Sequence, residues 1–77
     1  MKLEIITPDK TIYNGDAELV QLPGIDGSFE ILNNHAPMIS ALKKGEIKVK
    51  KSTGDEFFEI NGGVIEVLKN KILILAE

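Results

Sequence analysis

The chain has 77 residues, a formal net charge of −3 and no cysteine. This length gives room for one domain with a thin hydrophobic core, because a chain of this size buries only about 60% of the surface that its unfolded form exposes. The acidic balance argues against nucleic acid as the main partner, and the lack of cysteine excludes a disulfide scaffold and a thiolate zinc site.

Short runs in which apolar and polar residues alternate fill most of the chain, as in half-buried strands. In chain order, we predict strands near residues 2–7, 10–13, 17–22, 28–32, 38–42, 46–51, 56–60, 63–68 and 71–76. Many short strands with frequent turns are typical of a β-sandwich or a β-barrel. The amino-terminal residues lack the apolar core of a secretion signal, and we expect a soluble protein that faces the cytosol.

Turn signals separate several of these runs. The residue types at Asn14-Gly15 and Asn61-Gly62 suit tight hairpins. Ser52–Glu56 and Lys69-Asn70 supply two more breaks between strand-like runs. Residues 36–45 are compatible with a short helix that ends at a glycine, and a half-buried strand fits that segment equally well.

The last predicted strand is apolar on both of its faces. Ile72 and Ile74 lie on one side, and Leu73 and Leu75 lie on the other. A sandwich strand needs only one apolar face for its core. The second face is therefore either covered by a neighbouring loop or an interface for another chain.

No catalytic, cofactor or metal site emerges from the reactive residues. His35 is the only histidine, and no serine lies in the G-x-S-x-G signature of a nucleophile. A turn histidine that donates to a nearby carbonyl explains His35 more simply. The glycines at 24 and 27 resemble a nucleotide-binding loop, but a strand-like run follows them where such a loop needs a helix.

A segment in the middle of the chain, LPGIDGSFEILNNHAPMISALKKGEIKV (Leu22 to Val49), closely resembles a pattern in the epsilon subunit of F-type ATP synthase, which is called delta in mitochondria. The matching residues are Pro23, Gly24, Gly27, Phe29, Ile31, Leu32, His35, Ala36, Pro37, Leu42 and Gly45. Both ends of the chain are similar to the family as well. Two positions depart from the pattern: Glu30 stands where the family usually has glycine, and Asn33 where it usually has proline.

The resemblance implies a flattened antiparallel β-sandwich of about nine or ten short strands over residues 1–77. It implies a non-catalytic rotor subunit of the central stalk, without a cofactor, that packs on the gamma subunit and on the c-ring and supports coupling of proton transport to ATP synthesis. The complex would contain the alpha and beta catalytic subunits and would lie at the cytoplasmic face of the bacterial inner membrane, so that membrane association is peripheral.

The resemblance also implies two groups of contact residues. The residues expected to face the c-ring are Ser28, Asn33, Asn34, His35 and Met38. The residues expected to face the gamma subunit are Thr7, Ile12, Ile39 and Ser40. The apolar members of both groups could equally belong to an ordinary core.

Typical epsilon subunits continue into a C-terminal two-helix domain, which restrains ATP hydrolysis and in some bacteria binds ATP. This sequence stops at Glu77, so we expect that domain to be absent, with no inhibitory arm and no ATP site, unless the sequence is a fragment. The alternatives are a small enzyme or an unrelated β-rich module that binds proteins or oligonucleotides. An aromatic content of 5% and the negative charge argue against an oligonucleotide-binding barrel.

Overall fold

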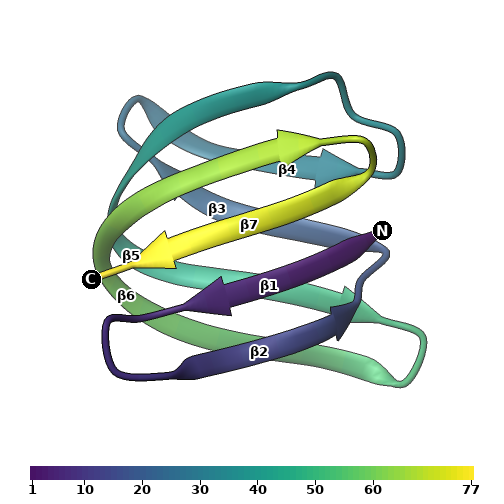
Figure 1. Cartoon of the computed structure of the whole chain (residues 1–77), viewed down its shortest axis with the longest axis horizontal. Helices are drawn as coiled ribbons and strands as arrows, with labels where there is room; N and C mark the ends of the chain where they lie inside the picture. The colour runs from purple at the N-terminus through teal and green to yellow at the C-terminus, as the bar shows by residue number, and fades with distance from the viewer.

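The computed structural model describes all 77 residues and contains seven β-strands and no helix. The strands are β1 (Lys2–Ile6), β2 (Thr11–Asp16), β3 (Leu19–Gly24), β4 (Gly27–Leu32), β5 (Met38–Lys51), β6 (Gly54–Leu68) and β7 (Lys71–Ala76). They form one sheet in the order β2-β1-β7-β6-β5-β3-β4 (Figure 1). All neighbouring strands are antiparallel except β1 and β7, which are parallel. The structure has no helix that could span a membrane.

Two of the strands are long and bend, which corrects the predicted number of strands. β5 joins the strands expected at 38–42 and 46–51, and β6 joins those expected at 56–60 and 63–68. Gly45 and Asn61-Gly62 therefore lie inside strands, and the predicted hairpin turn at Asn61-Gly62 is wrong. The backbone bends here without ending the ladder, because glycine adopts the positive φ of 154° that Gly63 requires.

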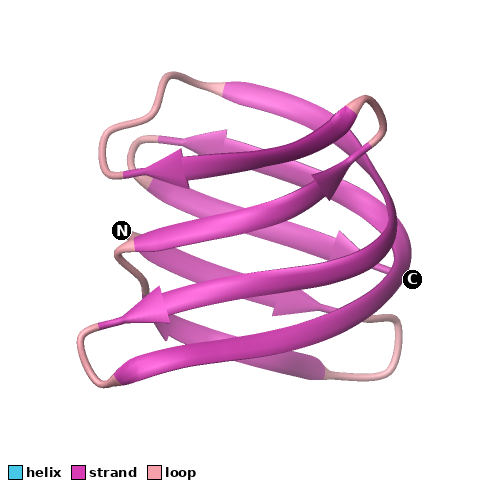
Figure 2. Cartoon of the chain, turned by 180° about the vertical axis from the view of Figure 1, so that it is seen from behind, coloured by secondary structure: helices cyan, strands magenta, loops and turns pink.

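The bends in β5 and β6 fold the single sheet into a two-layered sandwich. In Figure 2 these strands curve around the side of the molecule that carries the C-terminus. The first layer holds β2, β1, β7, residues 63–68 of β6 and residues 38–42 of β5. The second layer holds β4, β3, residues 45–51 of β5 and residues 54–60 of β6. The predicted all-β sandwich is thus confirmed, with seven strands in place of nine or ten.

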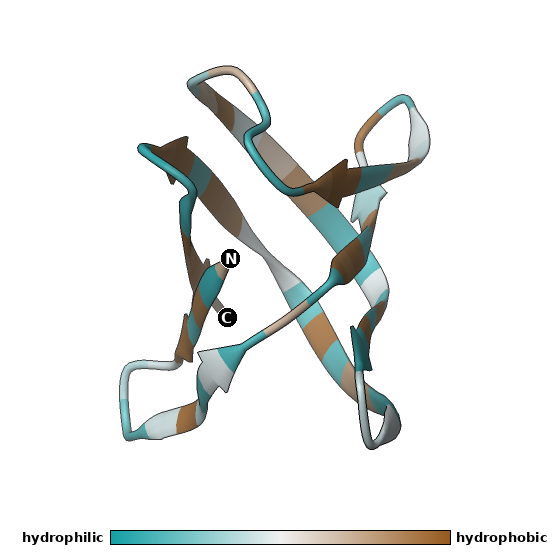
Figure 3. Cartoon of the chain, turned by 90° about the vertical axis from the view of Figure 1, so that its right-hand side faces the viewer, coloured by the Kyte–Doolittle hydropathy of each residue, from teal (hydrophilic) through white to brown (hydrophobic).

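Aliphatic side chains fill the space between the layers, and no polar or charged side chain is buried among them. The core consists of Leu3, Ile5, Ala17, Val20, Leu22, Ile31, Leu42, Ile47, Val49, Ile60, Ile65, Val67, Ile72, Ile74 and Ala76. Figure 3 shows the alternation of apolar and polar residues along the ribbon from which this core is built. Each fully buried Leu or Ile side chain stabilises the fold by about 1.5 to 3 kcal/mol relative to its exposed state.

The tight turns were predicted with mixed success. Lys69 and Asn70 form the expected two-residue turn between β6 and β7, with φ values of 51° and 59°. The turn predicted at Asn14-Gly15 is wrong, because both residues lie in β2 and pair with β1. Gly15 leaves space beside the phenol of Tyr13, whose hydroxyl lies 3.3 Å from where a Cβ would stand. The chain turns earlier, between Thr7 and Lys10.

The open side between β2 and the second layer is closed by an aromatic contact. Tyr13 of β2 and Phe58 of β6 meet edge to face, with their ring centroids 5.7 Å apart. Such pairs stabilise by about 0.5 to 1.5 kcal/mol beyond the area that they bury. The second layer is thereby held against the edge strand of the first.

Gly63→Ala tests the bend in β6. An alanine Cβ would lie 2.3 Å from the Leu75 carbonyl oxygen and would also require a strained φ. We expect the free energy of unfolding, measured with urea, to fall by about 2 to 3 kcal/mol. Gly54→Ala is the matched control, because Gly54 has a φ of 133° but open space around its Cβ position. Equal losses in the two variants would show that the close approach to β7 contributes nothing.

Candidate functional site

The outer surface of the first layer is apolar. On β7, Ile72 and Ile74 are buried, whereas Leu73 is partly exposed and Leu75 is 50% exposed. Hence no loop of this chain covers the second apolar face of the last strand. Neighbouring strands add outward-facing apolar side chains to this surface, which we call the outer apolar face: Ile6, Ile39, Ala41, Val64, Leu68, Leu73 and Leu75.

Strand register sets the arrangement of side chains on the outer apolar face. One row crosses four strands and contains only apolar residues: Ala41, Val64, Leu75 and Ile6. The next row alternates apolar and acidic residues: Ile39, Glu66, Leu73 and Glu4. A hollow of about 290 Å³ lies over Leu73 and extends between the two glutamates towards the β6–β7 turn. The face is therefore a mostly apolar surface with two carboxylates set in it.

The outer surface of the second layer is polar in contrast. Its strands present outward-facing charged or amide side chains: Gln21, Glu30, Glu46, Lys48, Lys50, Asp55 and Glu59. Lys48 and Asp55 form an ion pair of 3.7 Å between their Nζ and Oδ2 atoms. Exposed Phe57 and Leu32 are the large apolar side chains on this surface. A partner that buries apolar area therefore fits the first layer better than the second.

The loop Asn33–Pro37 is held against the end of the sandwich that carries the N-terminus (Figure 1). The amino group of Met1 donates to Oδ1 of Asn33 at 2.9 Å, and the backbone N–H of Asn34 donates to Oδ1 of Asn70 at 2.8 Å. The Nδ1 of His35 lies 2.7 Å from the Ala36 carbonyl oxygen, to which its N–H donates. This geometry agrees with the simpler interpretation of His35 as a turn histidine.

The structure divides the residues expected to face the c-ring into two groups. Asn33, Asn34 and His35 share the loop just described. Ser28 lies near the other end of β4, beside the β3–β4 turn, and its Oγ accepts a hydrogen bond of 3.0 Å from Gln21. Met38 packs partly against the core and lines a hollow of about 330 Å³ together with Ser28. Three of the five residues thus lie in the loop, and the other two line the hollow beside the β3–β4 turn.

The residues expected to face the gamma subunit are also separated. Ile39 is 72% exposed and lies on the outer apolar face, whereas Ser40 points to the opposite side of β5. Ile12 packs against the core. Thr7 lies in the β1–β2 turn, where its hydroxyl hydrogen-bonds the backbone of Lys10.

Sequence reasoning missed Val64 and Leu68 as members of the outer apolar face. The signal was present, since the run Gly63–Leu68 has apolar residues on both sides of the strand, as β7 has. Two adjacent strands with this property predict an exposed apolar surface more strongly than one strand does.

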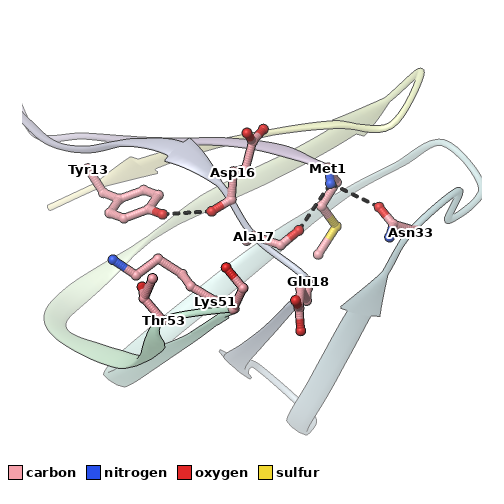
Figure 4. Close-up of a pocket in the computed structure, with 9 residues that line it drawn as sticks. Met1, Tyr13, Asp16, Ala17, Glu18, Asn33, Lys51 and Thr53 are labelled. Atoms are coloured by element: carbon pink, nitrogen blue, oxygen red, sulfur yellow. Dashed lines mark hydrogen bonds between the residues drawn. The ribbon is translucent and has the colours of Figure 1, made fainter.

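A third hollow, of about 420 Å³, opens between the edge of β2 and the β5–β6 turn (Figure 4). Tyr13 donates its hydroxyl to the Asp16 carbonyl oxygen at 2.8 Å, so this phenol supports the turn into β3. Figure 4 shows Lys51 lying below Tyr13, and its ammonium is 5.7 Å from the ring centroid. The hollow contains no pair of nucleophile and base in contact, and no three acidic, histidine or cysteine side chains of the protein could hold a metal ion together.

The fold changes the titration of Lys51. Its hydrogen bond to Glu56 raises its pKa above the ordinary value of 10.5. A raised pKa means that the interaction stabilises the fold fully below the ordinary lysine pKa of 10.5, and that this contribution is lost as the pH rises through the higher folded value. Because Lys51 is accessible to solvent, the interaction is structural and weak.

Comparison with known proteins gives the decisive observation. The sequence profile of the family described as "ATP synthase, Delta/Epsilon chain, beta-sandwich domain" matches residues 1–77, the whole chain. The chain belongs to this family. The resemblance deduced from residues 22–49 is thus confirmed over the full length, and the departures at Glu30 and Asn33 do not remove it.

Several relatives in the delta/epsilon family carry the name ATP synthase epsilon chain. The protein from Chlorobium limicola is 42% identical over 77 residues, which are 99% of this chain and 88% of the relative. A protein from Propionigenium modestum, named as the sodium ion specific epsilon chain, is 40% identical over 76 residues, which are 99% of this chain and 56% of the relative. The chain therefore spans most of the first relative and about half of the second.

Two solved structures contain chains with the same fold. A chain in the mitochondrial ATP synthase central stalk and c-ring of Tetrahymena thermophila matches with a TM-score of 0.83 at 21% identity, covering 97% of this chain and 61% of that one. A chain in the Euglena gracilis mitochondrial ATP synthase matches with a TM-score of 0.89 at 19% identity, covering 96% and 48%. At these identities the likeness supports the fold.

Leu75→Ser and Ile74→Ser test whether the outer apolar face is free in the isolated chain. The two residues are adjacent on β7 but lie on opposite sides. We expect Leu75→Ser to change the free energy of unfolding by less than about 1 kcal/mol and to reduce the binding of a hydrophobic fluorescent dye. We expect Ile74→Ser to lower that free energy by about 3 kcal/mol or more. Similar losses in both variants would mean that Leu75 is already packed.

Proposed function

We propose that the chain is a non-catalytic rotor subunit in the central stalk of an ATP synthase. In this role it links the gamma subunit to the membrane c-ring and supports the coupling of proton transport to ATP synthesis. The observation that carries the proposal is the outer apolar face, a surface that this sandwich leaves uncovered. The names of the curated relatives, and the central-stalk titles of solved structures with this fold, support the same role.

The outer apolar face is the proposed gamma-facing surface. A flat, mostly apolar sheet surface suits a lasting contact between subunits, because obligate interfaces are more hydrophobic than transient ones. Ile39 lies on this face, and Thr7 follows Ile6 at its border. Ile12 and Ser40 lie on the core side of their strands. In this proposal they pack beneath the outer apolar face and do not contact the gamma subunit.

The loop that bears Asn33, Asn34 and His35 is the first proposed c-ring-facing contact. Its amide and imidazole groups can hydrogen-bond polar loop ends without burying an unpaired charge. Ser28 and Met38, which line a separate hollow, provide a second contact in this proposal. The chain would then associate with the membrane peripherally, through the complex, at the cytoplasmic face of a bacterial inner membrane.

Affinity purification from detergent-solubilised membranes tests the rotor role. The tagged chain is the bait, and a Leu75→Asp, Ile39→Asp bait is the matched control, since both side chains are exposed and their loss should leave the fold intact. We expect the native bait to recover the gamma subunit, the alpha and beta subunits and the c-ring, and the control bait to lose them. Recovery of the native bait alone, with folding verified by circular dichroism, would refute the role.

His35→Ala tests the contribution of the loop. Because the imidazole is bonded only to the neighbouring Ala36 carbonyl oxygen, we expect unfolding to be unchanged and recovery of the c-ring to fall several-fold. Glu59→Gln, an exposed substitution on the outer surface of the second layer, serves as the control. A variant that unfolds, while its folded fraction assembles normally, would assign His35 to the fold alone.

A further inference from the structure

Two carboxylates lie inside the outer apolar face, one on each side of Leu73. Glu66 on β6 and Glu4 on β1 are the cross-strand neighbours of Leu73. Ile39 lies beyond Glu66 in the same row. Any surface that covers Leu73 and its apolar neighbours must therefore also remove water from Glu4 and Glu66.

Neither carboxylate has a cationic partner within this chain. The two ion pairs of the protein, Lys48–Asp55 and Lys51–Glu56, both lie in the second layer. Lys71 on β7 is diagonal to both glutamates, and Lys2 lies two residues from Glu4 on the same side of β1. Lys69 and Lys71 line the hollow over Leu73 together with the two glutamates. Diagonal neighbours on a sheet are about 7 to 8 Å apart, and no ammonium lies within 4.0 Å of either carboxylate.

Covering an unpaired carboxylate with an apolar surface is strongly unfavourable, whereas a cation placed against it offsets the loss of hydration. We propose that the surface that docks on this face presents two basic side chains, one for Glu4 and one for Glu66, with an apolar side chain between them that contacts Leu73. This inference rests on the proposed function, in which the gamma subunit occupies the face, and it assigns the chemistry of that contact.

The sheet sets the spacing of the two basic side chains. Neighbouring strands lie about 4.8 Å apart, so Glu4 and Glu66, separated by β7, lie about 10 Å apart. An α-helix rises 1.5 Å per residue, and residues seven apart lie on one face about 10.5 Å from each other. A helix that crosses the strands can therefore place cations at positions i and i+7 over the glutamates, with an apolar residue at i+3 or i+4 over Leu73.

Binding of the purified chain to the purified gamma subunit, measured by calorimetry at low and high salt, tests the inference. We expect Glu4→Gln and Glu66→Gln each to weaken binding about tenfold, and the double variant to lose much of the salt dependence. Glu30→Gln and Glu59→Gln are matched controls on the outer surface of the second layer. We expect these controls to bind like the native chain.

Substitution of the nearby lysines separates pairing with the partner from pairing within the chain. If the partner supplies the cations, Lys2→Gln, Lys69→Gln and Lys71→Gln should each leave binding unchanged or tighten it. Weakening by these variants, to the extent seen for the glutamate variants, would mean that the chain neutralises its own carboxylates and would overturn the inference. Unchanged or tighter binding by Glu4→Gln and Glu66→Gln would also overturn it.

The same measurement distinguishes failure of this inference from failure of the proposed function. If the native chain binds gamma and all four glutamate variants bind it equally well, the rotor role is retained. The proposed pair of basic side chains on the partner is then refuted. A native chain that does not bind gamma at all refutes both. Urea unfolding of each variant verifies that its fold is intact.

Discussion

The continuous ladder between β5 and β6 is the constraint on which the rest of the structure depends. It begins at Met38 and Val67 in the first layer and ends at Lys51 and Gly54 in the second. Both layers are therefore parts of one hydrogen-bonded sheet, and their relative position is fixed by backbone bonds as well as by side-chain packing. The bend in β6 that joins the two layers requires glycine at position 63, because the Cβ of any other residue would collide with β7.

This construction separates the roles of the two outer surfaces. The first layer contributes strands that are apolar on both faces, so one side of each forms the core and the other remains available to a partner. The second layer follows the ordinary pattern of apolar residues inside and charged residues outside. A small domain with a thin core thus keeps a substantial apolar area on its surface. Such an area promotes aggregation in water unless a partner covers it or the carboxylates within it keep the domain soluble.

Much of the fold could be predicted from local patterns, and the parts that could not depend on long-range pairing. The two-faced pattern of Leu73 and Leu75 left open whether a loop covers the second face, and the structure shows that it is exposed. Lys69-Asn70 correctly indicated a break between strands. Asn14-Gly15 has the composition of a turn, but pairing with β1 and the space needed by Tyr13 outweigh that local preference. At Gly45 and Gly62 the sequence contained the signal of a break, and only the tertiary structure determines whether a glycine ends a strand or bends it.

The candidate contact residues were harder to predict, because their grouping depends on strand direction and register. Ile39 and Ser40 are adjacent in sequence but lie on opposite sides of β5, and a shift of one residue in register would exchange them. Ser28 and Asn33 are only five positions apart, yet β4 separates them by about 16 Å at the rise of an extended strand. Positions along a motif therefore do not determine which of its residues share a surface.

The parallel pairing of β1 with β7 has a consequence for how the chain folds during synthesis. The first strand finds its central partner only in the last one, so β1 and β2 can form a hairpin early but cannot join the sheet until residues 71–76 have left the ribosome. Until then the inner side of β1, with Leu3 and Ile5, has no core to enter, and the nascent chain presents it to chaperones or to other chains. Closure of the sandwich is thus a late event that requires contacts between the two ends of the sequence, which predicts slow folding for so small a domain.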